Sequence, residues 1–263
     1  MKHLLLTAFT LLIAFMLAPA ARGEIKSEMI DYAHGDVALR GFVAYDAART
    51  GKRPAVLVCH EWWGMNETAQ EKCKQLAKEG YVAFALDMYG KGQVTTEPAQ
   101  ASAWLGKVFN DPKLLRERAA AGLKVLTSRP ECDASKVAVT GYCMGGTIAL
   151  ELARTGADLK AVVCFHTSNI AAKDPADNAK IKGKVLVCNG ADDTMVKQEE
   201  KAAFMKQMKE AKIDHQFIEY GGAVHAFTNP QADTFKIPSV GYNAAADKRS
   251  WRAMKGLFDE VFA

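Results

Sequence analysis

The feature of this chain that most constrains its fold is the run Gly141-Tyr142-Cys143-Met144-Gly145-Gly146. Glycines two places before and two places after a central residue let neighbouring backbone segments close up around a sharp turn from a strand into a helix. The preceding residues 136–140 form a short apolar stretch typical of a buried strand, and residues 146–154 have the pattern of a helix. The sequence therefore predicts a strand, a tight elbow and a helix, with the thiol of Cys143 at the tip of the turn.

Strand and helix patterns alternate along most of the chain. This alternation is typical of a mostly parallel sheet with helices on both faces, so the predicted fold class is α/β. Right-handed crossovers in such a sheet place active groups at the carboxyl ends of the strands. An early antiparallel strand is expected at 37–45. The other strand candidates are 55–59, 81–86, 137–140, 161–165, 185–188 and 216–220, and the helical stretches lie around 66–79, 97–107, 112–127, 146–155, 198–211 and 243–261.

The first 23 residues resemble a secretory signal peptide. Lys2 supplies a positive charge, an apolar run from Leu4 to Leu17 follows, and small residues come next. The run is shorter than the roughly 20 residues that span a membrane, and no second apolar run follows it. We therefore expect residues 1–23 to be cleaved on export and the protein to be periplasmic or secreted, without a membrane anchor. An uncleaved anchor is the alternative.

The remaining residues, 24–263, suit one large α/β domain, because no linker, low-complexity tract or internal repeat divides them. The whole chain has a formal net charge of +4. Without Lys2 and Arg22, 32 basic residues face 30 acidic ones, and the net charge falls to +2. The charges are interspersed, so the sequence indicates no nucleic-acid-binding face.

The six cysteines include no Cys-x-x-Cys pair and show no metal-ligand spacing, so we predict neither a thioredoxin-like site nor a metal site. Cys59, Cys164 and Cys188 lie in apolar strand candidates, where cysteine behaves as a small hydrophobe. Only Cys73 and Cys132 are expected to be exposed enough to form a disulfide in an oxidising compartment.

Three chemically suited residues follow three strand candidates in the order nucleophile, acid, histidine. Cys143 follows the strand at 137–140, Asp192 and Asp193 follow 185–188, and His225 follows 216–220. This is the chain order of the triads of α/β-hydrolases. A thiol is mostly protonated at neutral pH, so Cys143 needs His225 to take its proton or to stand by as imidazolium. An aspartate must then orient the imidazole. We favour Asp193, and Asp192 remains the alternative.

Several motifs together make the chain resemble the dienelactone hydrolase family over nearly its whole length after the leader. They are the Cys143 elbow, His60-Glu61-Trp62-Trp63-Gly64, Asp87-Met88-Tyr89, Gly190-Ala191-Asp192-Asp193-Thr194-Met195-Val196 and His225-Ala226-Phe227. The resemblance implies an α/β-hydrolase fold and cleavage of an enol-lactone by acyl transfer to a cysteine, with no metal or cofactor.

The resemblance also implies roles for individual residues. Cys143 is the nucleophile, His225 the base and later the acid, and Asp193 the orienting group, by its place three before Val196. Glu61 matches a glutamate that lies beside the thiol and takes part in its activation. From the residues alone, an apolar setting would desolvate Glu61 and raise its proton affinity. An ion pair or turn cap is the other interpretation of Glu61, and His60 is expected to be structural.

Hydrolysis through a tetrahedral intermediate needs N–H donors for the oxyanion. Met144, directly after the nucleophile, is expected to supply one, and Trp62 the other. Trp63 is expected to shape the pocket wall, and simple packing of either indole is the alternative. His166, at the end of the strand at 161–165, either lines the site or packs in its turn.

Two positions depart from the family pattern. Where the type enzyme has arginines that help to hold the substrate carboxylate, this chain has Lys91 and Asn229, and we expect these two side chains to bind substrate in their place. Lysine keeps a charge without the bidentate fork, and asparagine keeps neither, so a carboxylated dienelactone is a doubtful substrate.

The sequence thus predicts an exported, cysteine-dependent hydrolase of small acidic or neutral esters or lactones. Two alternatives from other classes remain open. One is a binding protein that holds a ligand in a hydrolase fold without turnover, and the other is a redox sensor in which Cys143 is oxidised reversibly.

Overall fold

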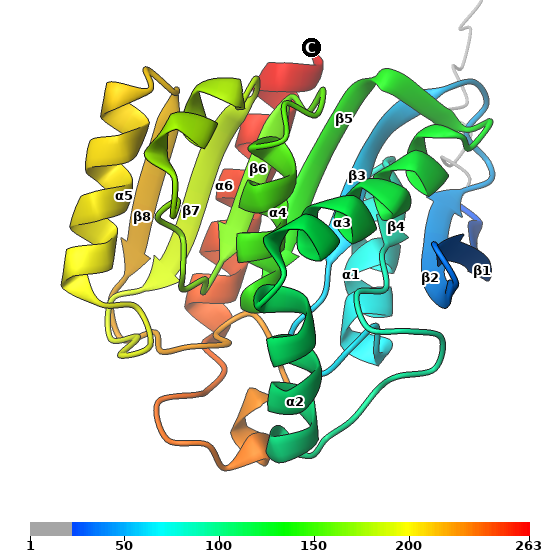
Figure 1. Cartoon of the computed structure of the whole chain (residues 1–263). Coiled ribbons are helices and arrows are strands. Elements are labelled where there is room, and N and C mark those ends of the chain that lie inside the picture. Colours follow the sequence, from blue (N-terminus) through cyan, green and yellow to red (C-terminus); the bar gives the residue numbers. More distant parts are fainter. Residues whose placement is uncertain (1–22) are drawn as a thin grey trace, which may run out of the picture.

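The computed structural model describes residues 23–263, so the predicted leader lies, except for Gly23, outside the described residues. An eight-stranded sheet runs through the molecule in the order β1-β2-β4-β3-β5-β6-β7-β8 (Figure 1). Strands β1, β2 and β4 pair antiparallel, and every other pair is parallel. The strands are β1 (Ile25–His34), β2 (Val37–Asp46), β3 (Arg53–Cys59), β4 (Val82–Ala85), β5 (Cys132–Tyr142), β6 (Ala161–Phe165), β7 (Lys184–Gly190) and β8 (His215–Tyr220).

Helices connect the parallel strands, and three of them begin at an asparagine or aspartate cap. The side chains of Asn66, Asp111 and Asn243 accept a hydrogen bond from the first turn of α1, α3 and α6, which satisfies a backbone donor left free at a helix start. No helix within residues 23–263 is long and apolar enough to cross a membrane. The helices are α1 (Glu67–Lys78), α2 (Pro98–Phe109), α3 (Pro112–Thr127), α4 (Met144–Ala153), α5 (Gln198–Glu210) and α6 (Ala244–Phe262), with short 3-10 turns η1 (Pro175–Lys180) and η2 (Ala232–Phe235).

The sheet buries an apolar core on each face, because successive strand residues point to opposite sides. In β3, Leu57 packs in the core under α2, α3, α4 and α5, whereas Val56 and Val58 pack in the core under α1 and α6. Figure 1 shows α3 and α4 in front of the sheet and α6 behind it. Strands covered on both faces explain the continuous apolar runs in the sequence.

The α/β fold class is confirmed, and the predicted helices and parallel strands are present with shifts at their ends. β1 was not predicted. It is an edge strand that pairs only with β2, and most of its side chains are exposed, so it carries polar residues in place of a hydrophobic run. β5 begins five residues earlier than the predicted start at Val137.

The expectation that Cys73 and Cys132 are exposed enough to form a disulfide is wrong. Both are free and buried. Cys73 lies in the core under α1 and α6, and Cys132 lies in the core on the other face of the sheet. A covalent bond between them would have to pass through the sheet.

Candidate active site

The elbow at Cys143 joins β5 to α4 at the carboxyl edge of the sheet. Cys143 has φ 56° and ψ −123°, a backbone conformation that non-glycine residues rarely adopt and that stores strain. A side chain at Gly141 would collide with the Gly145 carbonyl, and one at Gly145 would collide with the carbonyl oxygens of Cys59 and His60. Only glycine fits at these two positions, because the neighbouring backbone segments lie too close for a side chain. The start of α4 can therefore pack against the loop after β3.

The structure brings Cys143, His225 and Asp193 into one series of contacts. His225 Nε2 lies 3.1 Å from Cys143 Sγ, and His225 Nδ1 lies 2.8 Å from Asp193 Oδ2. The other carboxylate oxygen, Asp193 Oδ1, accepts the backbone N–H of Met195 at 2.9 Å, which holds the carboxylate in place. Asp193 is buried, whereas Asp192 is exposed. Of the two aspartates considered from the sequence, only Asp193 contacts the imidazole.

Charges on both sides of the imidazole control its protonation. Burial opposes a positive charge on His225, but a thiolate at Cys143 and the hydrogen-bonded carboxylate of Asp193 outweigh burial and raise the pKa of His225 to about 10. Because Nε2 lies within hydrogen-bond reach of Sγ, the imidazole can take the proton of the thiol and return it. The contacts therefore suit Cys143 for nucleophilic attack.

The backbone of the elbow is held by buried groups behind it. The Cys143 N–H donates to the Phe165 carbonyl at 3.0 Å and points toward His166 Nδ1 at 3.2 Å. With Nδ1 as an acceptor, His166 Nε2 carries the proton and donates to Thr228 Oγ1 at 2.8 Å. Burial lowers the pKa of His166 well below its ordinary value, which keeps the ring neutral.

The backbone amides of Trp62 and Met144 lie on the two segments that Gly145 packs together. Met144 is the first residue of α4, where the N–H has no partner within the helix. Among residues 23–263 neither amide donates a hydrogen bond to another residue. The Trp62 carbonyl accepts a hydrogen bond from Tyr89 Oη at 3.0 Å, and the same hydroxyl lies 3.1 Å from Met144 Sδ. Tyr89 thus ties the two amide-bearing segments together.

Glu61 lies at the boundary between the pocket and the protein interior. It is buried, and its Oε2 accepts a hydrogen bond from Asn229 Nδ2 at 2.7 Å. Burial raises the pKa of Glu61, and this rise is opposed by Asn229, His225 and Lys72. His60 has a structural place: its Nδ1 donates to the Glu61 carbonyl and its Nε2 accepts the Met88 N–H.

Cys143 opens into a pocket of about 490 Å³. Its walls are mainly apolar and include Trp62, Trp63 and side chains of α2. Trp63 packs between Trp62 and Phe235, with ring centroids 4.6 and 5.0 Å away. Among the described residues, no lysine or arginine lines this pocket. Its lining residues are Glu61, Trp62, Trp63, Ser102, Leu105, Gly106, Phe109, Asn110, Cys143, Met144, Thr147, Ser168, Asn169, Met195, His225, Ala226, Phe235, Ile237 and Val240.

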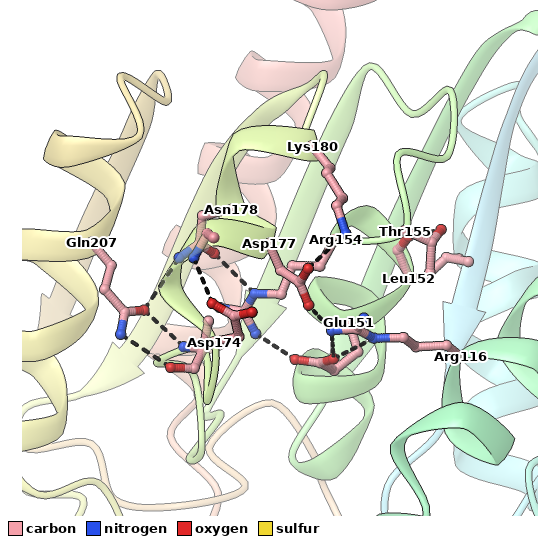
Figure 2. A network of polar contacts seen from close by, with 12 residues as sticks. Arg116, Glu151, Leu152, Arg154, Thr155, Asp174, Asp177, Asn178, Lys180 and Gln207 are labelled. Atoms are coloured by element: carbon pink, nitrogen blue, oxygen red, sulfur yellow. Dashed lines mark hydrogen bonds and ion pairs between the residues drawn. The ribbon is translucent and has the colours of Figure 1, made fainter.

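A buried polar network fixes the wall that Ser168 and Asn169 form. Figure 2 shows Arg154, at the end of α4, amid this network. Its guanidinium donates to the Ile170 carbonyl at 2.6 Å and to Asn178 Oδ1 at 2.9 Å. Gln207 of α5 bonds to both the N–H and the carbonyl of Ala172. The loop after β6 is therefore held by α4 and by α5.

Comparison with known proteins identifies the family. A sequence model of the dienelactone hydrolase family matches residues 39–262. The chain belongs to the dienelactone hydrolase family.

Relatives known from sequence and from solved structures agree with this assignment. A dienelactone hydrolase-like promiscuous phosphotriesterase from metagenomic libraries is 41% identical, with a TM-score of 0.88 over 91% of this chain and 99% of that one. A protein of Aquifex aeolicus named "Putative carboxymethylenebutenolidase" is 29% identical over 80% of this chain and 91% of its own length. An α/β-hydrolase from a deep-sea metagenome library shares the fold, with a TM-score of 0.63 at 18% identity. The protein is thus a hydrolase of the dienelactone hydrolase family.

Two residues expected to bind substrate in this dienelactone hydrolase-family member lie elsewhere. Lys91 is on the surface, where its Nζ contacts Asp31 at 2.6 Å, and Arg40 and Lys91 together hold the pKa of Asp31 well below its usual range. Asn229 is buried behind the pocket, where it binds Glu61. The prediction that Lys91 and Asn229 contact substrate therefore needs correction, because one side chain is drawn to a surface carboxylate and the other to a buried one.

His166 also does not line the pocket. It supports the elbow from behind, which agrees with the alternative interpretation that it packs in its turn. Residues of α2 and of the segment 235–240 do line the pocket but were not among the predicted site residues. They come from segments far from the motifs in the sequence. Most of them are apolar, and apolar residues that line a pocket cannot be told from core residues by sequence alone.

Proposed function

We propose that this protein hydrolyses small neutral esters or lactones by acyl transfer to Cys143. The observation that carries the proposal is the continuous contact from Asp193 through His225 to Cys143 at the floor of an apolar pocket. Nucleophile, base and orienting acid in hydrogen-bond reach of one another are the parts that acyl transfer requires.

The reaction follows from these positions. The Cys143 thiolate attacks the carbonyl carbon, and the N–H groups of Trp62 and Met144 stabilise the oxyanion that forms. The intermediate collapses, the C–O bond of the leaving group breaks, and the His225 imidazolium gives its proton to the departing alkoxide. Water then attacks the thioester, with His225 taking the proton of the water, and the acid is released as the thiolate re-forms.

The pocket supports a neutral substrate over an acidic one. The charged carboxylate of a dienelactone would have no lysine or arginine among the described lining residues to pair with. It would also approach Glu61, and an ionised Glu61 opposes binding of an anion. We therefore narrow the substrate class to uncharged acyl groups.

The test compares wild type with Cys143→Ala on paired substrates under reducing conditions. Each pair contains one ester or lactone in neutral form and the same molecule bearing a carboxylate. Turnover that disappears in Cys143→Ala and favours the neutral member is expected. Equal inactivity of wild type and mutant would reject hydrolysis and favour ligand binding, and reversible oxidation of Cys143 without turnover would favour the redox sensor.

A second candidate activity is hydrolysis of neutral phosphotriesters. It is favoured by the 41% identical relative named as a promiscuous phosphotriesterase and by the mainly apolar walls of the pocket. Wild type should then release the phenol of an aryl phosphotriester, and Cys143→Ala should not. Equal release by both proteins would reject this activity.

We also propose that residues 1–23 direct export. Expression of the full chain in a bacterial host, followed by fractionation and N-terminal sequencing, is expected to give a periplasmic or secreted protein that begins close to Glu24. An intact Met1 in the cytoplasmic fraction would contradict export, and an intact Met1 in the membrane fraction would favour the uncleaved anchor.

A further inference from the structure

Lys72 is a buried lysine that the proposed reaction does not use. It lies on α1, and its side chain is only 6% exposed. Its Nζ donates to the Thr228 carbonyl at 3.0 Å and lies 3.7 Å from Asp247 Oδ1 on α6. The ammonium group also lies 5.4 Å from the centre of the Tyr142 ring. A lysine is rarely buried unless it is paired, so this position suggests a specific electrostatic role.

Lys72 and Glu61 line the same small cavity. The cavity is about 10 Å³ in volume, and both side chains line it together with Tyr142 and Thr228. The Tyr142 hydroxyl is buried and has no hydrogen-bond partner among residues 23–263. Glu61 lines both this cavity and the pocket of Cys143. One carboxylate therefore faces the active site on one side and a buried cation on the other.

Two cations oppose the rise in the pKa of Glu61, His225 and Lys72, and of these Lys72 takes no part in the proposed reaction. Asn229 is a neutral hydrogen-bond donor to the carboxylate. Burial lowers the pKa of both His60 and His166, which keeps both rings neutral. Burial raises the pKa of Tyr142, so its hydroxyl stays protonated. His225 changes its charge during the proposed reaction.

We propose that Lys72 is a positioning residue that keeps Glu61 ionised beside the active site, with Asp247 holding the lysine in its charged form. Burial lowers the pKa of Lys72, whereas Asp247 and Glu61 raise it. Asp247 in turn accepts a hydrogen bond from Tyr242 Oη at 3.2 Å. The consequence for catalysis rests on the proposed function, because an ionised Glu61 on the wall of the pocket interacts with the imidazolium of His225 that the reaction uses.

The decisive measurement is a titration of the Glu61 carboxyl carbon by NMR, with ¹³C-labelled glutamate and with Glu61→Gln to assign the signal. In wild type the midpoint is expected below about pH 7, and in Lys72→Met it should rise by about 1 unit or more, as expected on loss of a nearby opposite charge. Lys72→Arg, which keeps the charge, should stay closer to wild type than Lys72→Met. Lys78→Met, which removes an exposed charge from the same helix, is the matched control and should leave the midpoint unchanged.

A wild-type midpoint above about pH 7 would overturn the proposal without any variant of Lys72, so the test holds even if Lys72→Met fails to fold. Equal midpoints in wild type and Lys72→Met would overturn it as well. The titration does not depend on turnover, so an inactive protein with the expected shift would reject the proposed function and leave this inference standing. In an active protein, the acid limb of kcat/KM should shift with Lys72→Met but show no further shift in the Glu61→Gln background.

Discussion

Replacing Cys143 with alanine should lower the pKa of His225 by about 2 units or more, because it removes the anion next to the imidazole. The contact between His225 Nε2 and Cys143 Sγ is 3.1 Å. Two unit charges at this separation interact by about 5 kcal/mol at an effective dielectric constant of about 20, which corresponds to about 4 pKa units. The imidazolium of wild type is expected to persist to about pH 10. In the variant, burial lowers the pKa of His225 against Asp193 and Glu61, without the thiolate.

The assay is an NMR titration of the imidazole carbon and proton signals between pH 5 and 11. Only spectra recorded at pH values where the protein stays folded are used to fit the midpoint. His225→Gln assigns the signal among the six histidines. The sign is defined by the charge removed: loss of a negative neighbour disfavours the imidazolium, so the midpoint must move to lower pH. Because the readout is protonation, it is independent of which substrate the enzyme accepts.

The reasoning would be refuted by a His225 midpoint in Cys143→Ala within about half a unit of wild type, since the charges would then not be coupled. Cys188→Ala is the matched control. Cys188 is buried in β7, and burial raises the pKa of its thiol to about 12. This thiol is neutral over most of the titration, so its removal should not move the His225 midpoint.

Two further predictions concern the acid and the elbow. In steady-state assays, Asp193→Asn should lower kcat/KM by about 10³–10⁴-fold, because the imidazole loses its orienting carboxylate. Replacing the exposed Asp192 with asparagine should leave kcat/KM close to wild type, and equal losses in the two variants would contradict the choice of acid. Gly145→Ala should destabilise the protein by about 1–3 kcal/mol, because its methyl group meets the backbone oxygens of Cys59 and His60. The free energy of unfolding of each variant is measured by denaturant titration. The control Gly256→Ala, at a position in open space on α6, should be neutral or stabilising by up to about 1 kcal/mol. Equal stability of the two variants would show that the elbow can relax.

Local patterns were sufficient for much of the architecture. Alternating apolar strands and amphipathic helices indicated a parallel sheet, and the glycine spacing around Cys143 indicated the strand, turn and helix that the structure contains. Loops that follow parallel strands lie at the same edge of the sheet, so the sequence also predicted that Cys143, an aspartate after β7 and His225 lie close together. The physical reason is that these features depend on residues close in sequence or on general rules of sheet topology.

The tertiary structure alone decided the remaining features. The sequence favoured Asp193 but left Asp192 open, because the distance of each carboxylate from His225 depends on which side chain turns inward. Lys72 has the same residue type as the surface lysines of its helix, and only the packing of α1 against α6 buries it near Glu61. The charges of these groups depend on burial and on contacts between residues far apart in the sequence. Neither can be predicted from a short stretch of sequence.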